Sequence, residues 1–177
     1  HRQIGLLSEP LRSVSARQRE NAWRQALADH QLTPHCALRG DWSAPSGYQA
    51  LLTQLPDDLP QALLVANDQM ALGAMRALHQ YGVAIPGEIS VIGYDDTAES
   101  VRYQPPLHTV RQDVHYLGAQ SVERMQARHQ GEEAPDNALE TTLGIRETTA
   151  TPAVKPGEVV YLCCERQRNC RWADGRS

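Results

Sequence analysis

The chain has 177 residues, about the length of one domain, and its 41% hydrophobic and 21% charged residues are typical of a soluble globular protein. Its net charge of −4 has the wrong sign for a domain that grips nucleic acid through the phosphates. No apolar run reaches the roughly 20 residues that span a bilayer, and the first residues lack the pattern of a signal peptide. We therefore expect no membrane association and a cytoplasmic location.

Strand-like and helical segments alternate along the chain. We expect strands at residues 4–7, 34–39, 62–66, 90–94, 109–110 and 139–145, and helices at residues 13–32, 47–55, 68–81 and 114–129. Strands separated by helices of this length form βαβ units, which build a mainly parallel sheet covered on both faces. The expected fold class is therefore α/β, a parallel sheet flanked by helices. Because the chain opens at His1 in a strand-like run, we also expect a fragment.

The helix at residues 68–81 is apolar around more of its circumference than a sheet requires of one helix. Met70, Leu72 and Met75 belong to this surplus. Either a second subunit covers the outer side or the helix is buried within a larger domain. The pattern by itself leaves both interpretations open.

The cysteines favour a reducing compartment over a disulfide scaffold. Cys36 stands alone in an apolar stretch, where we expect a buried thiol. Cys163, Cys164 and Cys170 lack the C-x-x-C spacing of a zinc site, so we expect no metal and no cofactor. They lie in segment 151–177, for which we expect a linker and a disordered tail; a nucleic-acid arm or a metal site there is a weaker alternative.

An enzyme is not indicated by the sequence. The chain lacks a G-x-S-x-G elbow, an H-E-x-x-H motif, a P-loop and a G-x-G-x-x-G loop. Its seven histidines are scattered singly, without an obvious acidic partner nearby. We therefore expect no catalytic residue.

Polar residues follow three of the expected strands. These are Gly40-Asp41-Trp42, Asn67-Asp68 and Asp95-Asp96. The carboxyl ends of parallel strands share one edge of the sheet, where ligands of α/β proteins bind. Carboxylate and amide groups there, with Arg19 and the apolar face of Trp42, would suit a polyol such as a sugar. Equally ordinary roles are helix caps, turn residues and a core tryptophan.

Adjacent carboxylates can indicate a cation site or acid–base chemistry. Asp95 and Asp96 leave the same strand, however, and successive strand residues point to opposite sides. We therefore expect them not to share one site.

Five strings carry a resemblance to a known family. They are S-V-S-A-R at residues 13–17, G-D-W-S-A at 40–44, V-A-N-D-Q-M-A-L-G-A-M-R-A at 65–77, I-S-V-I-G-Y-D-D-T at 89–97 and Y-Q-P-P-L at 103–107. In this order and spacing they resemble the sugar-responsive bacterial transcription repressors, and the longer strings resemble the lactose-repressor branch. The resemblance runs from residue 1 to about residue 149.

This resemblance implies the fold of the type I periplasmic sugar-binding proteins, in which two α/β subdomains joined by crossing strands close on a sugar. Residues 1–111 would form most of the C-terminal subdomain, 112–141 would cross into the N-terminal subdomain and 142–150 would return. The implied sugar contacts are Arg19, Asn67 and Asp95 for hydroxyls, Trp42 for the apolar ring face, and Ser15, Gln112 and Leu117 at the periphery.

The function implied by the resemblance is allosteric repression. A homodimer binds operator DNA through helix-turn-helix heads and releases it when a galactoside-type inducer binds. The dimer contacts would include Met70, Leu72, Met75, Thr97 and Tyr103. The helix-turn-helix and part of the N-terminal subdomain are missing, so we expect no operator binding by this chain alone and partial exposure of 112–141. A sugar-binding protein of a transport system is the alternative.

Overall fold

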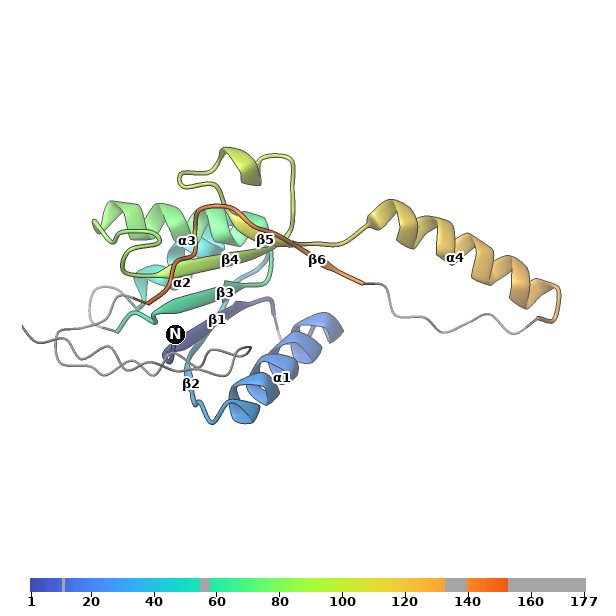
Figure 1. Cartoon of the computed structure of the whole chain (residues 1–177), viewed down its shortest axis with the longest axis horizontal. Helices are drawn as coiled ribbons and strands as arrows, with labels where there is room; N and C mark the ends of the chain where they lie inside the picture. Colours follow the sequence, from blue (N-terminus) through green and yellow to red (C-terminus); the bar gives the residue numbers. More distant parts are fainter. Residues whose placement is uncertain (11, 55–57, 133–139, 153–177) are drawn as a thin grey trace, which may run out of the picture.

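The computed structural model describes residues 1–10, 12–54, 58–132 and 140–152, which form a six-stranded sheet with flanking helices (Figure 1). In chain order the elements are β1 (Ile4–Ser8), α1 (Val14–Asp29), β2 (Pro34–Arg39), α2 (Ala44–Leu52), β3 (Ala62–Val65), α3 (Asp68–Gln80), β4 (Ser90–Asp95), the short 3-10 helix η1 (Ser100–Arg102), β5 (His108–Arg111), α4 (Val114–His129) and β6 (Thr142–Gly144).

The strand order is β2-β1-β3-β4-β5-β6. Every neighbouring pair is parallel except β5 with β6, which is antiparallel. The predicted α/β class, a mainly parallel sheet flanked by helices, is therefore confirmed. The parallel register brings the carboxyl ends of β1, β2, β3 and β4 to one edge of the sheet.

Two apolar clusters cover opposite faces of the sheet. On one face α2 and α3 pack on strand side chains that include Leu7, Leu63 and Val91. On the other face Trp23 and Leu27 of α1 pack on Leu6. Neighbouring strand residues such as Leu6 and Leu7 point to opposite faces, so one apolar strand serves both clusters. Figure 1 shows α1 on one side of the sheet and α3 on the other.

Capping side chains set the starts of the helices. Ser13 Oγ accepts a hydrogen bond from Ala16 N at α1, and Asn67 Oδ1 accepts one from Met70 N at α3. The helix expected at 47–55 instead begins at Ala44, because Ser43 supplies the cap. The last strand is Thr142–Gly144, shorter than the expected 139–145, of which residue 139 lies outside the described part.

Two glycines let α2 and α3 approach through their backbones. A Cβ atom on Gly73 would lie 1.8 Å from the Ala44 carbonyl oxygen, and one on Gly47 would lie 2.2 Å from the Met70 carbonyl oxygen. Helix α3 thus buries one side against the sheet and another against α2. This packing explains most of its apolar surplus, because Met70 and Met75 are 0% and 4% exposed, whereas Leu72 is 39% exposed.

The segment after β6 runs back along the sheet. Thr148 is fully buried; its Oγ1 donates to the Val91 carbonyl oxygen over 2.6 Å, and its carbonyl oxygen accepts from Val91 N over 2.8 Å. His108 N, at the start of β5, donates to Thr148 Oγ1 over 2.8 Å. The segment therefore fills the edge of β4 just before β5 begins.

Helix α4 stands away from the sheet (Figure 1). It has no buried residue. Val114, Leu117, Val122 and Met125 are between 45% and 73% exposed, at the spacing of an apolar stripe along one side of a helix. The exposure expected for segment 112–141 is thus present over α4.

Two predicted regions lie partly or wholly outside the described residues. The tail with Cys163, Cys164 and Cys170 lies wholly outside them, as does most of the expected linker.

Among the described residues, no helix is long and apolar enough to cross a membrane, and no group of three metal-ligating side chains comes together.

Candidate ligand-binding site

Polar side chains from β1, β2, β3 and β4 meet at the carboxyl edge of the sheet. Glu9 follows β1, Trp42 follows β2, Asn67 follows β3, and Asp95 ends β4. Helix α1 adds Arg19, which reaches this edge from one face of the sheet. This edge is where parallel α/β sheets bind ligands.

Arg19 is held by three groups. Its Nη1 donates to Glu9 Oε1 over 2.9 Å and to the Ala66 carbonyl oxygen over 2.8 Å. Its guanidinium carbon lies 4.2 Å from the centroid of the Tyr94 ring, a cation–π distance. A guanidinium fixed in this way presents its remaining donors in a constant direction.

Glu9 is the buried anchor of this arrangement. It is 1% exposed, and the Ser8 and Ser15 hydroxyls each donate to its carboxylate over 3.3 Å. Ser15 is itself exposed and lies 2.7 Å from Ser13 across their hydroxyl oxygens. The predicted residue Ser15 therefore orients the partner of Arg19.

Asn67 links two parts of the edge. Its Oδ1 accepts from Met70 N over 2.8 Å, so the helix-cap alternative is confirmed for this residue. Its Nδ2 donates to the Trp42 carbonyl oxygen over 3.0 Å. Trp42 has a positive φ of 74° and its side chain is on the surface, with the residue 40% exposed. The amide thus fixes the backbone from which the indole projects.

Groups that act in opposite directions on its pKa surround the Asp95 carboxyl. Desolvation by the surrounding protein and the nearby charges of Asp68 and Glu9 raise the pKa of its carboxyl, while the charge of Arg19 acts in the opposite direction. Its φ of 114° is rare for a residue other than glycine. Strained backbone of this kind gathers at functional sites.

Asp96 turns away from this group, as expected from the alternation of strand residues. Its carboxylate pairs with Arg111 and Arg146 instead. The two adjacent aspartates therefore do not share one site.

The structure does not bring all the predicted residues together. Gln112 is half-buried just after β5, and Leu117 is 45% exposed on α4, away from the sheet. Arg19, Trp42, Asn67, Asp95 and Ser15 belong to the sheet edge. Glu9 and Tyr94 are part of the same edge and were missed, although Glu9 follows its strand as the other polar residues do.

The predicted dimer residues divide into two groups. Met70, Met75 and Tyr103 are buried within the apolar core of the subunit, so their side chains are not on its surface. Leu72 is exposed and Thr97 is half-buried. Met70, Met75 and Tyr103 are thus covered within the subunit itself, and the dimer contact stays a prediction.

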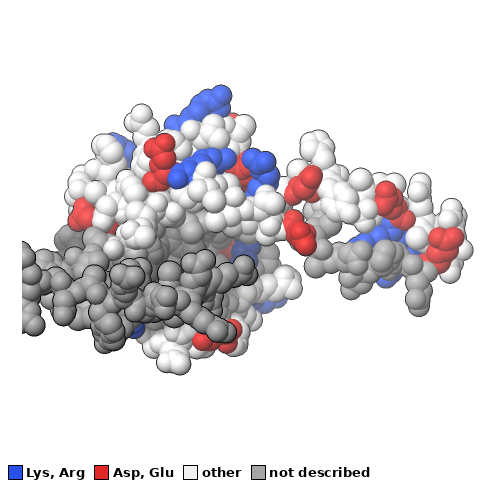
Figure 2. Space-filling model, in the orientation of Figure 1, with Lys and Arg blue, Asp and Glu red and all other residues white. Residues whose placement is uncertain are grey.

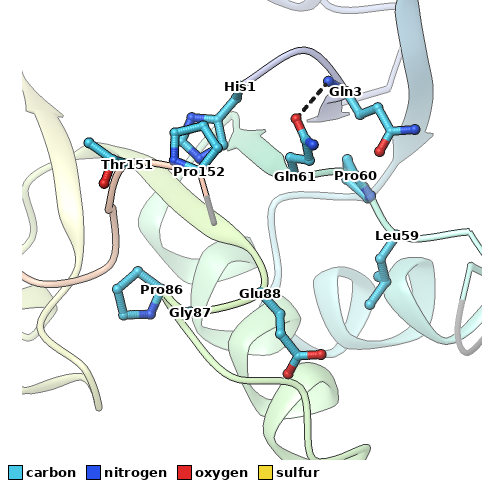
Figure 3. Close-up of a pocket in the computed structure, with 10 residues that line it drawn as sticks. All are labelled: His1, Gln3, Leu59, Pro60, Gln61, Pro86, Gly87, Glu88, Thr151 and Pro152. Carbon is cyan, nitrogen blue, oxygen red and sulfur yellow. Dashed lines mark hydrogen bonds between the residues drawn. The ribbon is translucent and has the colours of Figure 1, made fainter. Parts of the chain in front are cut away.

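A hollow of about 280 Å³ lies at the opposite, amino end of the strands (Figure 3). Three prolines and the side chains of Gln3, Gln61 and Glu88 contribute to its wall. Gln61 Oε1 accepts from Gln3 N over 3.3 Å, so it serves the backbone of the first residues. This hollow is separate from the candidate site.

Residues 1–149 match the family model of the periplasmic binding protein-like domain. The chain belongs to this family, whose fold is the one that the sheet and its ligand edge define. Within it, the chain is similar to lactose operon repressors. It is 43% identical over 177 residues to that of Escherichia coli (strain K12), with 95% of this chain and 49% of the relative covered.

A second relative and two solved structures agree. The lactose operon repressor of Klebsiella pneumoniae is 48% identical over 126 residues, which cover 71% of this chain and 36% of the relative. A lac repressor dimer bound to operator and the anti-inducer ONPF is 46% identical with a TM-score of 0.82, covering 85% of this chain and 54% of that one. The lac repressor bound to ONPG is 48% identical with a TM-score of 0.80, covering 84% and 46%. The chain thus spans about half the length of these relatives or less.

Proposed function

We propose that the chain is the inducer-binding and dimerisation core of a lactose-repressor-like transcriptional regulator. Its ligand is a galactoside-type sugar. The observation that carries this proposal is the group at the carboxyl edge of the sheet, where Glu9 fixes the guanidinium of Arg19 and the charge of Arg19 acts on Asp95, an exposed residue at the end of β4. Trp42 follows β2 at the same edge. Asp95 accepts hydrogen bonds from sugar hydroxyls, Arg19 donates to them, and the indole packs on the apolar face of the ring.

Asn67 and Ser15 complete the site in this proposal. Within the protein, the Asn67 amide donates one hydrogen bond through Nδ2 and accepts one at Oδ1. A second N–H and a second lone pair of Oδ1 are left to bond a sugar hydroxyl. Ser15 borders the ligand beside Glu9. Gln112 and Leu117 contribute from the crossing segment at the periphery.

The proposed domain organisation allows an allosteric mechanism. Residues 1–111 form the C-terminal subdomain, 112–141 belong to the N-terminal subdomain, and 142–150 return. β5 leads out to α4 and β6 leads back, so a ligand at the carboxyl edge lies beside both crossing strands. A sugar that binds one arrangement of the subdomains more tightly than the other shifts the equilibrium between them.

The partners follow from the same proposal. The chain forms a homodimer, and operator DNA is bound through the helix-turn-helix that the resemblance implies for the full-length protein. A dimeric lac repressor bound to operator is among the similar structures. A sugar-binding protein of a transport system is not favoured, because the similar proteins are transcriptional repressors. Repressors of this kind are not enzymes, so the proposal includes no catalytic activity. The location that fits a repressor is the cytoplasm.

Asp95→Asn in the full-length protein tests the site. Loss of a charge-assisted hydrogen bond costs about 1.5–3 kcal/mol, so we expect methyl β-galactoside to bind about 10- to 150-fold more weakly. Isothermal titration calorimetry measures this change. Asp29→Asn, at the far end of α1, serves as the control and leaves the affinity unchanged. Equal affinity of Asp95→Asn and the unmodified protein would refute the assignment.

A further inference from the structure

Asp96 is held by one arginine at the end of β5 and one in the segment that follows β6. Arg111 is the last residue of β5, and Arg146 lies two residues beyond β6. Both guanidinium groups form ion pairs with the Asp96 carboxylate, whose side chain is 4% exposed. We call these three residues the Asp96 clamp. In Figure 2, basic and acidic side chains lie next to one another over the part of the sheet from which the chain leaves toward α4.

Arg146 is the more constrained of the two arginines. Its Nη1 donates to Ser100 Oγ over 3.0 Å and to the Leu107 carbonyl oxygen over 2.7 Å, while Nη2 pairs with Asp96. Its side chain is 14% exposed, against 60% for Arg111. These contacts need the planar fork of arginine, which a lysine ammonium does not reproduce.

The charge state of Asp96 agrees with this geometry. Desolvation acts to raise the pKa of its carboxyl, but the hydrogen bonds and charges of Arg146 and Arg111 outweigh it, and the pKa is lowered. Asp96 therefore remains a carboxylate at neutral pH, and both ion pairs persist.

The clamp acts on the residue next to the candidate ligand contact. Asp95 and Asp96 have consecutive positive φ angles of 114° and 55°. Residues other than glycine keep such angles only where the surroundings hold them. Asp96 N donates to Thr109 Oγ1 over 3.2 Å, which fixes the backbone, and the clamp fixes the side chain. Among the described residues, no hydrogen bond holds the Asp95 carboxylate itself.

We propose that Arg146, assisted by Arg111, is a positioning residue of the sugar site. By holding Asp96, the clamp sets the direction in which Asp95 presents its carboxylate. Because the two arginines belong to the segments that cross between the subdomains, the direction of the Asp95 carboxylate depends on the position of those segments. The inference rests on the proposed sugar-binding function, since it concerns the same site. The clamp does not touch the sugar; it acts through Asp95.

A double-mutant cycle with methyl β-galactoside separates positioning from general stabilisation. We expect Arg146→Gln in the full-length protein to weaken binding by at least about tenfold, because the contact that it supports is worth about that much. Arg111→Gln, at an exposed position that is safe for folding, gives a smaller loss of affinity. Arg146→Lys restores little, since it keeps the charge without the fork. In an Asp95→Asn background the Arg146→Gln effect disappears.

Arg24→Gln is the matched control. Arg24 and Arg39 share the buried carboxylate of Glu20 as Arg111 and Arg146 share that of Asp96, but on α1 and β2. We expect its loss to leave the galactoside affinity unchanged. Any effect of Arg146→Gln that equals that of Arg24→Gln overturns the inference, as does an Arg146→Gln effect that persists in the Asp95→Asn background.

Amide hydrogen exchange tests positioning without ligand. In Arg111→Gln and Arg146→Gln we expect the Asp96 and Thr97 amides to exchange faster, while the amides of α1 keep their protection. Unchanged exchange at Asp96 and Thr97 overturns the inference even if sugar binds. If the unmodified protein does not bind the galactoside but the amides respond, the proposed function fails together with the role of the clamp in it, while the clamp remains as a constraint on the backbone.

Discussion

At the scale of single residues, Asn67 and Asp68 show how adjacent polar residues divide their tasks. Asn67 caps α3, whereas Asp68 is fully buried and ties α3 to two later segments. Its carboxylate accepts from Thr97 N over 2.9 Å and from Thr109 Oγ1 over 2.6 Å. Desolvation raises the pKa of the Asp68 carboxyl and outweighs the hydrogen bonds from Thr109 and Thr97, which act in the opposite direction. The sequence placed both residues at the ligand edge, but the partners of Asp68 lie 29 and 41 residues further along the chain, where no local pattern indicates them.

His108 makes stability depend on pH. Burial and the charge of Arg146 lower its pKa from the ordinary value of 6.5. The unfolded chain therefore binds the proton more readily, and stability is lost as the pH falls below about 6.5 toward the folded pKa. We expect the free energy of unfolding in urea to fall less between pH 7.5 and 5.5 in His108→Gln than in the unmodified protein. Equal pH dependence in the two proteins would contradict the prediction.

At the scale of elements, the contact between α2 and α3 is set by the absence of side chains. A Cβ atom added to Gly47 or to Gly73 would lie closer than van der Waals contact to backbone atoms of the other helix. The sequence pattern correctly predicted both helices but gave no sign of their pairing, since the glycines are spread over two segments. Their contact accounts for apolar residues that the pattern by itself left open to a subunit interface.

Gly73→Ala tests this contact. The added methyl group meets the Ala44 carbonyl oxygen, so the helices must separate and their shared packing is lost. We expect a loss of about 1–3 kcal/mol in the free energy of unfolding, measured with urea. Gly118→Ala is the control, because a Cβ there meets nothing within 4 Å in α4. That change should leave stability unchanged or raise it by up to about 1 kcal/mol; similar losses in both variants would argue against the close-contact explanation.

Helix α4 has no apolar partner among the residues that the structure describes. Because its apolar stripe is exposed, α4 gains little stability from tertiary packing, and an isolated helix of this length is only marginally stable. We expect a hydrophobic dye to bind the 177-residue chain and helical circular dichroism to fall before the sheet unfolds in urea. Replacing Val122 and Met125 by glutamine should reduce the dye signal without moving the main transition. A single cooperative transition without dye binding would contradict this expectation.

At the scale of the whole molecule, a dimer depends on which apolar groups remain outside the subunit core. Leu72 on α3 and Val101 in η1 are 39% and 47% exposed. Tyr103, by contrast, is 7% exposed, and its hydroxyl donates to the Asp68 carbonyl oxygen over 3.2 Å. A charge at Tyr103 would disturb the fold itself, so Leu72 is the better position from which to test association.

Leu72→Asp should shift the protein from dimer to monomer. A carboxylate in an apolar interface loses its hydration without gaining a partner. Light scattering coupled to size-exclusion chromatography measures the mass of the species. Gln18→Asp on α1, which covers the opposite face of the sheet, is the control and should leave the mass unchanged. A dimer mass retained by Leu72→Asp would exclude α3 from the interface.

The alternation of strands and helices, the helix caps and the polar residues after the strands were readable from the sequence, because each depends on residues close together in the chain. The α/β class and the placing of Arg19, Trp42, Asn67 and Asp95 at one edge follow from these local patterns. Tertiary structure decided the rest: the burial of Met70, Met75 and Tyr103, the anchoring of Arg19 by Glu9, and the Asp96 clamp. The buried side chains and the clamp join segments distant in sequence, and such contacts depend on how the whole sheet brings them together. Glu9 and Arg19 are only ten residues apart, but they meet because α1 packs back on the face of the sheet.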